Sequence, residues 1–337
     1  MKSIPVYVGL DYHQDSVQVC VLDSAGAVLR NGSYENDMLT IATVAENHGT
    51  QVHAAIESCT GAADLADELA LRAGWTIDLA HPGYVARMKQ NPDKTDFTDA
   101  RMLADLERVG YLPKVWLAPQ EVRELRRLVR YRQQLVDERR RIKLRVSALL
   151  RDQRVRCPYA SSTKGWHTWL KTTKEVSQES GWILKRHVKR VESLDREIQQ
   201  VATRLARRTK KDPMVLALLK EKGIGPVTAW TLRAEIGRFD RFRTGKQVSR
   251  FCGLSPRNAS SGQRQADAGL IQAGNRPLRA TLMQAAHRLI RYDAPWKDFA
   301  QKLLDRGKPK CVVVAATANR WMRRLFHQMQ PAGSSAA

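Results

Sequence analysis

The chain has 337 residues and a formal net charge of +23, and its 43% hydrophobic content is enough to bury at least two packed cores. No apolar run approaches the roughly 20 residues that cross a bilayer, and residues 1–10 lack the pattern of a secretory signal. We therefore expect a soluble, cytoplasmic protein without a membrane partner. The five cysteines are scattered and form no CxxC pair, which excludes a disulfide framework and a zinc finger and predicts reduced thiols.

The charge is unevenly distributed along the chain. Residues 1–118 hold 9 basic and 16 acidic side chains, a net charge of −7. Residues 119–211 carry +16 and residues 212–337 carry +14. A large basic surface attracts nucleic acid, because neutralising the phosphates releases their counterions. Nucleic acid is therefore the leading partner, and the alternative is a solvated basic surface without a specific ligand.

The acidic first third reads as an alternation of strands and helices. Three apolar stretches with turn signals between them predict an antiparallel meander of strands over 6–11, 17–22 and 27–34. They precede a helix over 37–48, a strand ending at 57, a helix over 62–73, a strand over 75–80 and a helix opening near 95. The order βββαβαβα predicts a mixed sheet with flanking helices, as in ribonuclease H-like domains.

The middle third has the pattern of long amphipathic helices. Residues 119–154 contain no Gly or Pro after the first residue, and Leu128, Leu135, Ile142 and Leu149 recur every seven residues. A second apolar series from Val191 to Leu205 predicts a helix that pairs with the first as an antiparallel coiled coil or joins a partner chain. The alternative to direct nucleic-acid contact here is a spacer or dimerising hairpin whose arginines face water.

The last third changes to short helices separated by glycines. We expect a ribonuclease H-like domain over 1–118, a basic coiled-coil linker over 119–211, a mainly helical domain over 212–330 and a disordered tail over 331–337. Gly223-Ile-Gly225 resembles the turn of a helix-hairpin-helix, which offers backbone N–H groups to a DNA phosphate. A tight packing turn between two helices is the equal alternative.

Acidic side chains follow the strands of the first third. Asp11 ends the first strand, Glu57 ends the fourth, and Asp96 and Asp99 lie on one face of a helix. Carboxylates are the ligands that Mg²⁺ prefers, so the set predicts a site for Mg²⁺ or Mn²⁺ that serves phosphodiester chemistry. Turn capping, surface exposure and a helix N-terminus are the alternative explanations. The eight histidines show no HxxxH spacing, and we expect no histidine-metal site.

A serine pair lies in a basic segment of the last third. Ser260-Ser261-Gly262-Gln-Arg264 puts hydroxyls near basic side chains, ahead of a helix start at Asn275. A serine in this position can attack a phosphate, and the alternative is an ordinary turn.

The combined motifs are specific. They are Gly9-Leu-Asp11, Ile56-Glu-Ser58, Lys94-Thr-Asp96, Asp99-Ala100, Gly223-Ile-Gly225, Gly253-Leu-Ser-Pro256, Ser261-Gly262, Gly274-Asn275 and Leu278-Arg279. In this combination the chain resembles transposases of the IS110 family, the group that includes the Piv-type DNA invertases. The resemblance runs from the first strand to about Arg291.

The resemblance implies a RuvC-like domain whose Asp-Glu-Asp-Asp metal site falls on Asp11, Glu57, Asp96 and Asp99. It also implies a coiled-coil linker and a C-terminal transposase domain with a serine nucleophile at Ser261, next to Ser260. Further implications are a covalent serine-DNA intermediate, a dimer or tetramer whose domains meet across subunits, and targeting by a structured RNA encoded by the element. The protein would then work on the bacterial nucleoid.

These inferences support the hypothesis of a Mg²⁺-dependent DNA recombinase. One alternative is a RuvC-like nuclease that cuts branched DNA with metal-activated water and forms no protein adduct. Another is an architectural nucleic-acid binder in which the acidic residues only support the fold.

Overall fold

The computed structural model describes residues 4–88, 95–258, 267–271 and 274–330. It divides into two compact units, Met1–Gln120 and Glu121–Ala337. Ser260, Ser261 and the expected tail over 331–337 lie outside the described residues. Within the described ranges, no helix is both long enough and apolar enough to span a membrane.

The first unit is built on a six-stranded mixed sheet in the order β3-β2-β1-β4-β5-β6. The central strands β1, β4 and β5 run parallel to one another, with β1 next to β4 and β4 next to β5. The outer strands are antiparallel: β2 pairs with β1, β3 pairs with β2, and β6 pairs with β5. The predicted meander and mixed sheet are thus confirmed. The strands are β1 (Pro5–Tyr12), β2 (Ser16–Leu22), β3 (Val28–Glu35), β4 (Gln51–Glu57), β5 (Thr76–Ala80) and β6 (Lys114–Val115).

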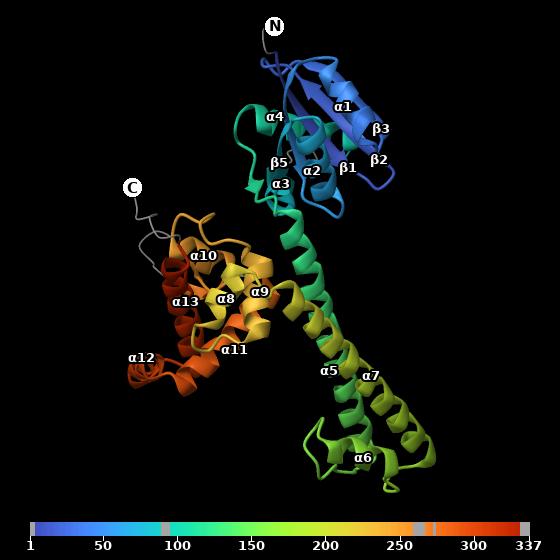
Figure 1. Cartoon of the computed structure of the whole chain (residues 1–337), viewed down its shortest axis with the longest axis vertical. Helices are drawn as coiled ribbons and strands as arrows, with labels where there is room; N and C mark the ends of the chain where they lie inside the picture. Colours follow the sequence, from blue (N-terminus) through green and yellow to red (C-terminus); the bar gives the residue numbers. More distant parts are fainter. Residues whose placement is uncertain (1–3, 89–94, 259–266, 272–273, 331–337) are drawn as a thin grey trace. The chain divides into compact units, whose positions relative to one another are not determined.

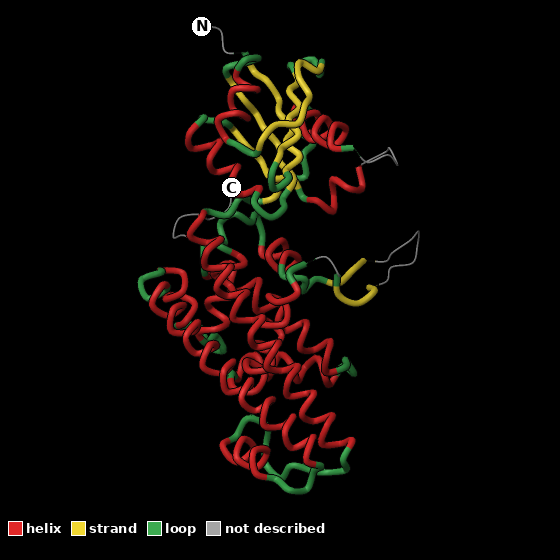
Figure 2. Tube along the Cα trace, turned by 90° about the vertical axis from the view of Figure 1, so that its right-hand side faces the viewer, coloured by secondary structure: helices red, strands yellow, loops and turns green. Residues whose placement is uncertain are grey.

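Helices cover both faces of this sheet (Figure 2). Among the described residues of this unit, the helices are α1 (Met38–Glu46), α2 (Ala62–Arg72), α3 (Pro82–Met88) and α4 (Asp96–Arg108). Because side chains alternate along a strand, Val8 and Leu10 of β1 enter the core with α1 and α2, whereas Tyr7 packs with Ala100 and Ala104 of α4. Asp11 lies four residues after Tyr7, so its side chain points to the same face of the sheet. The alternation therefore turns Asp11 toward the face that α4 covers.

Gly9 sets how closely α4 approaches β1. A Cβ atom at this position would lie 1.8 Å from the backbone oxygen of Ala100 and 2.6 Å from the backbone nitrogen of Ala104. No side-chain rotation relieves such a contact, because both neighbours belong to the helix backbone. The absence of a side chain at Gly9 therefore lets α4 pack on β1 two residues before Asp11.

Replacing Gly9 by alanine is expected to destabilise the protein by about 3 kcal/mol, because α4 must move off the strand to admit the methyl group. Urea denaturation followed by circular dichroism measures the change. Gly181→Ala is the matched control, since its Cβ meets nothing closer than 3.8 Å in a helix. Alanine there is expected to be neutral or to stabilise by up to about 1 kcal/mol. Equal stability of the two variants would contradict the close approach of α4.

The second unit opens with two long antiparallel helices, α5 (Gln120–Asp152) and α7 (Gln178–Arg208), joined through α6 (Lys164–Thr172) (Figure 1). Leu135, Ile142, Val146 and Leu150 of α5 share one apolar cluster with α6 and with Leu184 to Ile198 of α7. Arg139 pairs with Asp195 between the helices. The predicted amphipathic helices are confirmed and pack on each other within one chain; a coiled-coil geometry and a role in joining partner chains stay predictions.

The remaining helices form the second core of this unit. It joins Leu125 and Leu205, from the ends of the long helices, to residues of the later helices such as Trp230, Leu282 and Trp321. A short hairpin of β7 (Pro256–Asn258) and β8 (Asp267–Leu270) projects from this part of the chain. The helices are α8 (Pro213–Leu219), α9 (Pro226–Ile236), α10 (Gly245–Phe251), α11 (Arg276–Tyr292), α12 (Ala294–Asp305) and α13 (Lys310–Gln328).

Candidate active site

Two neighbouring parallel strands and one helix bring the four predicted carboxylates to one edge of the sheet. Asp11 lies at the end of β1 and Glu57 is the last residue of β4. Asp96 and Asp99 occupy the first turn of α4, where the Thr95 side chain caps the helix by accepting a hydrogen bond from the backbone of Thr98. Acidic residues are favoured at this end of a helix. Local sequence signals thus fix each residue, and the packing of α4 on β1 brings them together.

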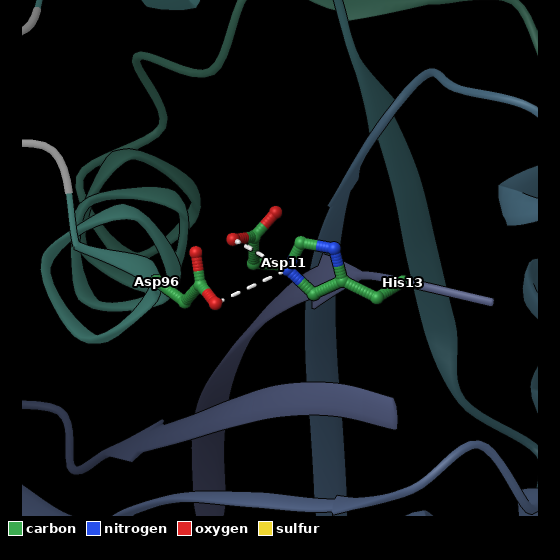
Figure 3. Close-up of side chains that lie close together, drawn as sticks. All are labelled: Asp11, His13 and Asp96. Atoms are coloured by element: carbon green, nitrogen blue, oxygen red, sulfur yellow. Dashed lines mark ion pairs between the residues drawn. The ribbon is translucent and has the colours of Figure 1, made fainter. Parts of the chain in front are cut away.

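Asp11, Asp96 and His13 form the closest group at this edge (Figure 3). The Nε2 atom of His13 lies 3.2 Å from Oδ2 of Asp96 and 3.6 Å from Oδ2 of Asp11. One potential ligand atom from each of the three residues lies within 4.8 Å of the others. The HxxxH criterion misses His13; its position two residues after Asp11, on the same side of an extended segment, is the signal that finds it.

The electrostatics of Asp11 show that the other carboxylates are near. Burial raises the pKa of Asp11 above its ordinary value; nearby His13 opposes the shift, while the charges of Asp96, Asp99 and Glu57 add to it. The four acidic groups therefore repel one another across this edge. A divalent cation would relieve that repulsion, so the oxygen-rich donor set fits Mg²⁺ or Mn²⁺.

The edge is open to solvent on one side. The side chains of Asp96 and His13 are 54% and 50% exposed, that of Asp11 is 18% exposed, and Asp99 is buried. Cys59 borders the same place, because the charges of Glu57 and Asp11 add to the rise that burial causes in its thiol pKa. Asp99 and most of Asp11 are therefore buried, while Asp96 and His13 are exposed beside them. Such a site is accessible to a large substrate, for example a nucleic-acid strand.

The segment that contains Ser260 and Ser261 has a well-anchored base. Its two ends meet where the backbone N–H of Ile271 donates to the oxygen of Ser255 at 3.0 Å. Arg279 of α11 donates from Nη1 to the oxygen of Ile271 at 2.9 Å. Gly274 lies against Gly253 so closely that a Cβ would come within 2.8 Å of the Gly253 Cα, and both glycines have positive φ. These glycines and Arg279 of the sequence motif therefore anchor the described residues on either side of the segment 259–266.

A buried carboxylate, Glu235 of α9, ties this base to the long helix α5. Glu235 is 3% exposed and accepts hydrogen bonds from Nε and Nη2 of Arg130 at 2.9 and 3.0 Å. Asn275, which caps the N-terminus of α11, donates from Nδ2 to Glu235 at 2.6 Å. Arg126 donates to the backbone oxygen of Ala234. One carboxylate therefore links α5, α9 and the start of α11.

Replacing Glu235 by alanine is expected to cost about 2 kcal/mol of folding free energy, because it removes the charged acceptor of the hydrogen bonds from Arg130 and Asn275. Thermal and urea unfolding at neutral pH measure the loss. Glu138→Ala removes an exposed acid from α5 and is expected to change stability by less than about 0.5 kcal/mol. A loss at Glu235 as small as that at Glu138 would show that the network contributes nothing to folding.

The Gly223-Ile-Gly225 turn connects α8 to α9. Gly223 has φ of +80°, and a Cβ there would lie 2.7 Å from the Leu289 side chain of α11. The close approach agrees with the packing role. Contact of this turn with a DNA phosphate stays a prediction.

Comparison with known protein families places the two blocks of motifs. A family model described as "Transposase", that of the DEDD domain of IS110 transposases, matches residues 8–154. A second, described as "Transposase IS116/IS110/IS902 family", matches residues 216–301. The first match includes all four predicted carboxylates and the second includes Ser261. Together the two models span most of the chain.

Individual relatives agree with these matches. A "Probable family 20 transposase" of Pseudomonas aeruginosa is 29% identical over 81% of this chain and 82% of its own length. The transposase for insertion sequence element IS1111A of Coxiella burnetii is 24% identical over 87% of this chain and 79% of its own length. The transposase for insertion sequence element IS1328 of Yersinia enterocolitica is 23% identical over 83% and 82%, respectively. The chain therefore belongs to the IS110 family of transposases.

Proposed function

We propose that this transposase cuts and rejoins DNA strands through a covalent serine-DNA intermediate, with Asp11, Glu57, Asp96 and Asp99 binding Mg²⁺ or Mn²⁺ and Ser261 acting as the nucleophile. The observation that carries the proposal is the meeting of Asp11 and Asp96, from β1 and α4, with ligand atoms within 4.8 Å. In a transposase, carboxylates that converge in this way have an evident use in phosphodiester chemistry.

The roles of the acidic residues follow from their positions. A divalent cation supplies charge neutralisation at the scissile phosphate. Asp11 and Glu57 present carboxylates from the rigid ends of adjacent strands. Asp99, buried in the first turn of α4, holds the inner side of the site, and exposed Asp96 faces the solvent from which DNA arrives. Rigid elements on three sides keep the carboxylates close despite their mutual repulsion.

The serine supplies the chemistry of strand exchange. Attack of the Ser261 hydroxyl on a DNA phosphate forms a serine phosphodiester and releases a DNA hydroxyl. Attack by the hydroxyl of another strand reverses these changes, which restores the serine and joins the strands. The number of phosphodiester bonds is conserved, so no high-energy cofactor is required. Arg279 holds Ile271, a described residue that follows the segment containing Ser261 in the sequence.

The basic part of the chain supports nucleic-acid partners. Residues 119–211 and 212–337 carry +16 and +14, opposite in sign to the −7 of residues 1–118. We assign residues 1–118 to the metal-binding RuvC-like domain, 119–211 to the linker and 212–330 to the transposase domain. We further propose element and target DNA, a structured guide RNA from the element, and a dimer or tetramer as partners, with activity on the bacterial nucleoid in the cytoplasm. Broad backbone contact suits a protein that leaves sequence choice to RNA.

A recombination assay tests this function. The protein, with RNA that co-purifies with it, is incubated with donor DNA carrying the native element flanks and with target DNA, and new junctions are amplified and sequenced. Junctions that form with Mg²⁺ and are absent with chelator support the proposal. Metal-dependent cuts with free ends and no junctions would indicate a nuclease, and tight binding without cuts or junctions would indicate an architectural protein.

A further inference from the structure

His13 brings a nitrogen atom into an edge otherwise composed of carboxylates. We propose that Nε2 of His13 is a direct ligand of the metal ion, together with Asp11 and Asp96. The inference rests on the proposed metal site and adds to it a residue outside the Asp-Glu-Asp-Asp set. It also implies a preference among metal ions.

The two separations of His13 from the carboxylates match those of ligands around one ion. Metal–ligand bonds of about 2.1 Å in octahedral geometry place adjacent donor atoms about 3.0 Å apart and opposite donor atoms about 4.2 Å apart. The 3.2 Å and 3.6 Å separations of His13 Nε2 from Asp96 and Asp11 lie within this range. The ligand atoms of Asp11 and Asp96 lie within 4.8 Å of each other, so binding of one ion by all three donors requires the side chains to adjust.

The backbone of His13 is held on both sides, so the turn that carries the ring is ordered. Its N–H donates to the oxygen of Ser16 at 2.9 Å, across the turn that joins β1 to β2. Its own carbonyl oxygen accepts from Nδ2 of Asn36 at 2.9 Å. Figure 3 shows the imidazole directed from this turn toward the two carboxylates. A ligand on an ordered backbone loses little entropy when it binds a metal ion.

The opposing possibility is that His13 competes with the metal ion. A protonated imidazole between two carboxylates makes ion pairs, and a cation would then have to displace it. The two roles predict opposite effects of removing the ring. Loss of a ligand weakens metal binding, whereas loss of a competitor strengthens it.

A nitrogen ligand also changes the order of metal affinities. Imidazole is a ligand of first-row transition-metal ions, most strongly of those that follow Mn²⁺ in the series, whereas Mg²⁺ prefers oxygen donors and keeps several waters. We therefore expect His13→Gln to weaken Mn²⁺ binding by about tenfold or more, by analogy with the loss of residues that support a metal site. The change in Mg²⁺ affinity is expected to be smaller, so the ratio of the two affinities falls in the variant.

Electron paramagnetic resonance of the full-length protein with Mn²⁺ as the probe tests the inference. The protein is first freed of bound nucleic acid, which itself binds Mn²⁺. Spin-echo modulation from a coordinated ¹⁴N nucleus is expected in the wild type and in the control His287→Gln, whose ring is exposed on α11. It is expected to be absent in His13→Gln. Titration of the Mn²⁺ signal gives the affinities, and thermal melting checks the fold of each variant.

Four other results have distinct meanings. Mn²⁺ bound without nitrogen modulation in the wild type, or bound more tightly by His13→Gln, would overturn the role of His13 and leave the carboxylate site intact. Nitrogen modulation that persists in His13→Gln would assign it to another residue and also overturn the inference. Mn²⁺ binding that Asp11→Ala does not weaken would contradict the proposed metal site itself.

Discussion

Replacing Asp11 by asparagine is expected to lower recombination by at least about 10³-fold while leaving the protein at least as stable as the wild type. The loss arises because charge stabilisation by a bound metal ion contributes several kcal/mol to phosphodiester chemistry, and each 1.36 kcal/mol is a factor of ten in rate. The preserved stability arises because the ionised form of Asp11 is disfavoured in the folded protein, by burial and by three neighbouring carboxylates.

The pH dependence of stability follows from the same shift. The pKa of Asp11 is higher in the folded chain than its ordinary value of 3.8, so between these two values the folded state binds more protons than the unfolded state. The free energy of unfolding therefore falls as the pH rises through this window, and above it ionised Asp11 destabilises the fold. The stability gained by Asp11→Asn is expected to be complete at neutral pH and to vanish below pH 3.8.

Unfolding curves of both proteins at several pH values, measured in the presence of chelator, check this expectation. Addition of Mn²⁺ is expected to raise the melting temperature of the wild type and not that of Asp11→Asn. Asp105→Asn is a matched control, because this acid lies on the same helix as Asp96 and pairs with Arg108. Recombination by Asp11→Asn at the level of the Asp105→Asn control would remove Asp11 from the site.

Replacing Ser261 by alanine is expected to abolish strand joining, with a loss of at least about 10⁴-fold. Removal of a nucleophilic serine costs on the order of 10⁶-fold in a serine hydrolase, and metal and DNA binding alone form no covalent intermediate. Ser260→Ala is the matched control, since it removes the same atom one residue away. Junction formation measured by quantitative amplification distinguishes the two variants.

The outcome assigns the nucleophile. Activity in Ser261→Ala together with inactivity in Ser260→Ala would move the nucleophile to Ser260. Activity in both variants would contradict a serine mechanism. Binding of DNA and the melting temperature are expected to be unchanged in both, because each substitution removes a single oxygen atom.

The fold of the first unit follows closely from its sequence. Alternation along β1 and turn signals before and after β2 are local features, and they give the strands to within one or two residues. Thr95 marks the start of α4 in the same way, because a threonine cap is visible in the sequence. The positions of Asp11, Glu57, Asp96 and Asp99 at element ends were therefore accessible without a structure.

Short or interrupted elements cannot be predicted from local sequence patterns in this way. Local patterns miss α3, in which Gly83 follows Pro82, and the two-residue strand β6. They also miss α6 and the β7-β8 hairpin, whose few residues give no clear period. Packing against longer elements, and not local preference, determines these segments.

Contacts between residues far apart in the sequence are the second feature that the sequence does not predict. The candidate role of His13 depends on Asp96, which is far from it in the sequence. Asp96 comes close to His13 only because α4 packs against β1 at Gly9. Glu235 and Arg130 are separated by 105 residues, so nothing in the neighbourhood of either predicts their pairing. Charged residues of this kind look like ordinary solvated surface in the sequence until the fold brings their partners together.

Trapping of a protein-DNA adduct tests the central claim most directly. Wild-type and Ser261→Ala proteins are incubated with co-purified RNA, Mg²⁺ and DNA that carries the native flanks, and the products are separated on a denaturing gel. A covalent adduct in the wild type that requires Mg²⁺ and is absent from Ser261→Ala is the predicted result. Mg²⁺-dependent cleavage by the wild type without any adduct would contradict the serine mechanism and indicate a nuclease that uses water.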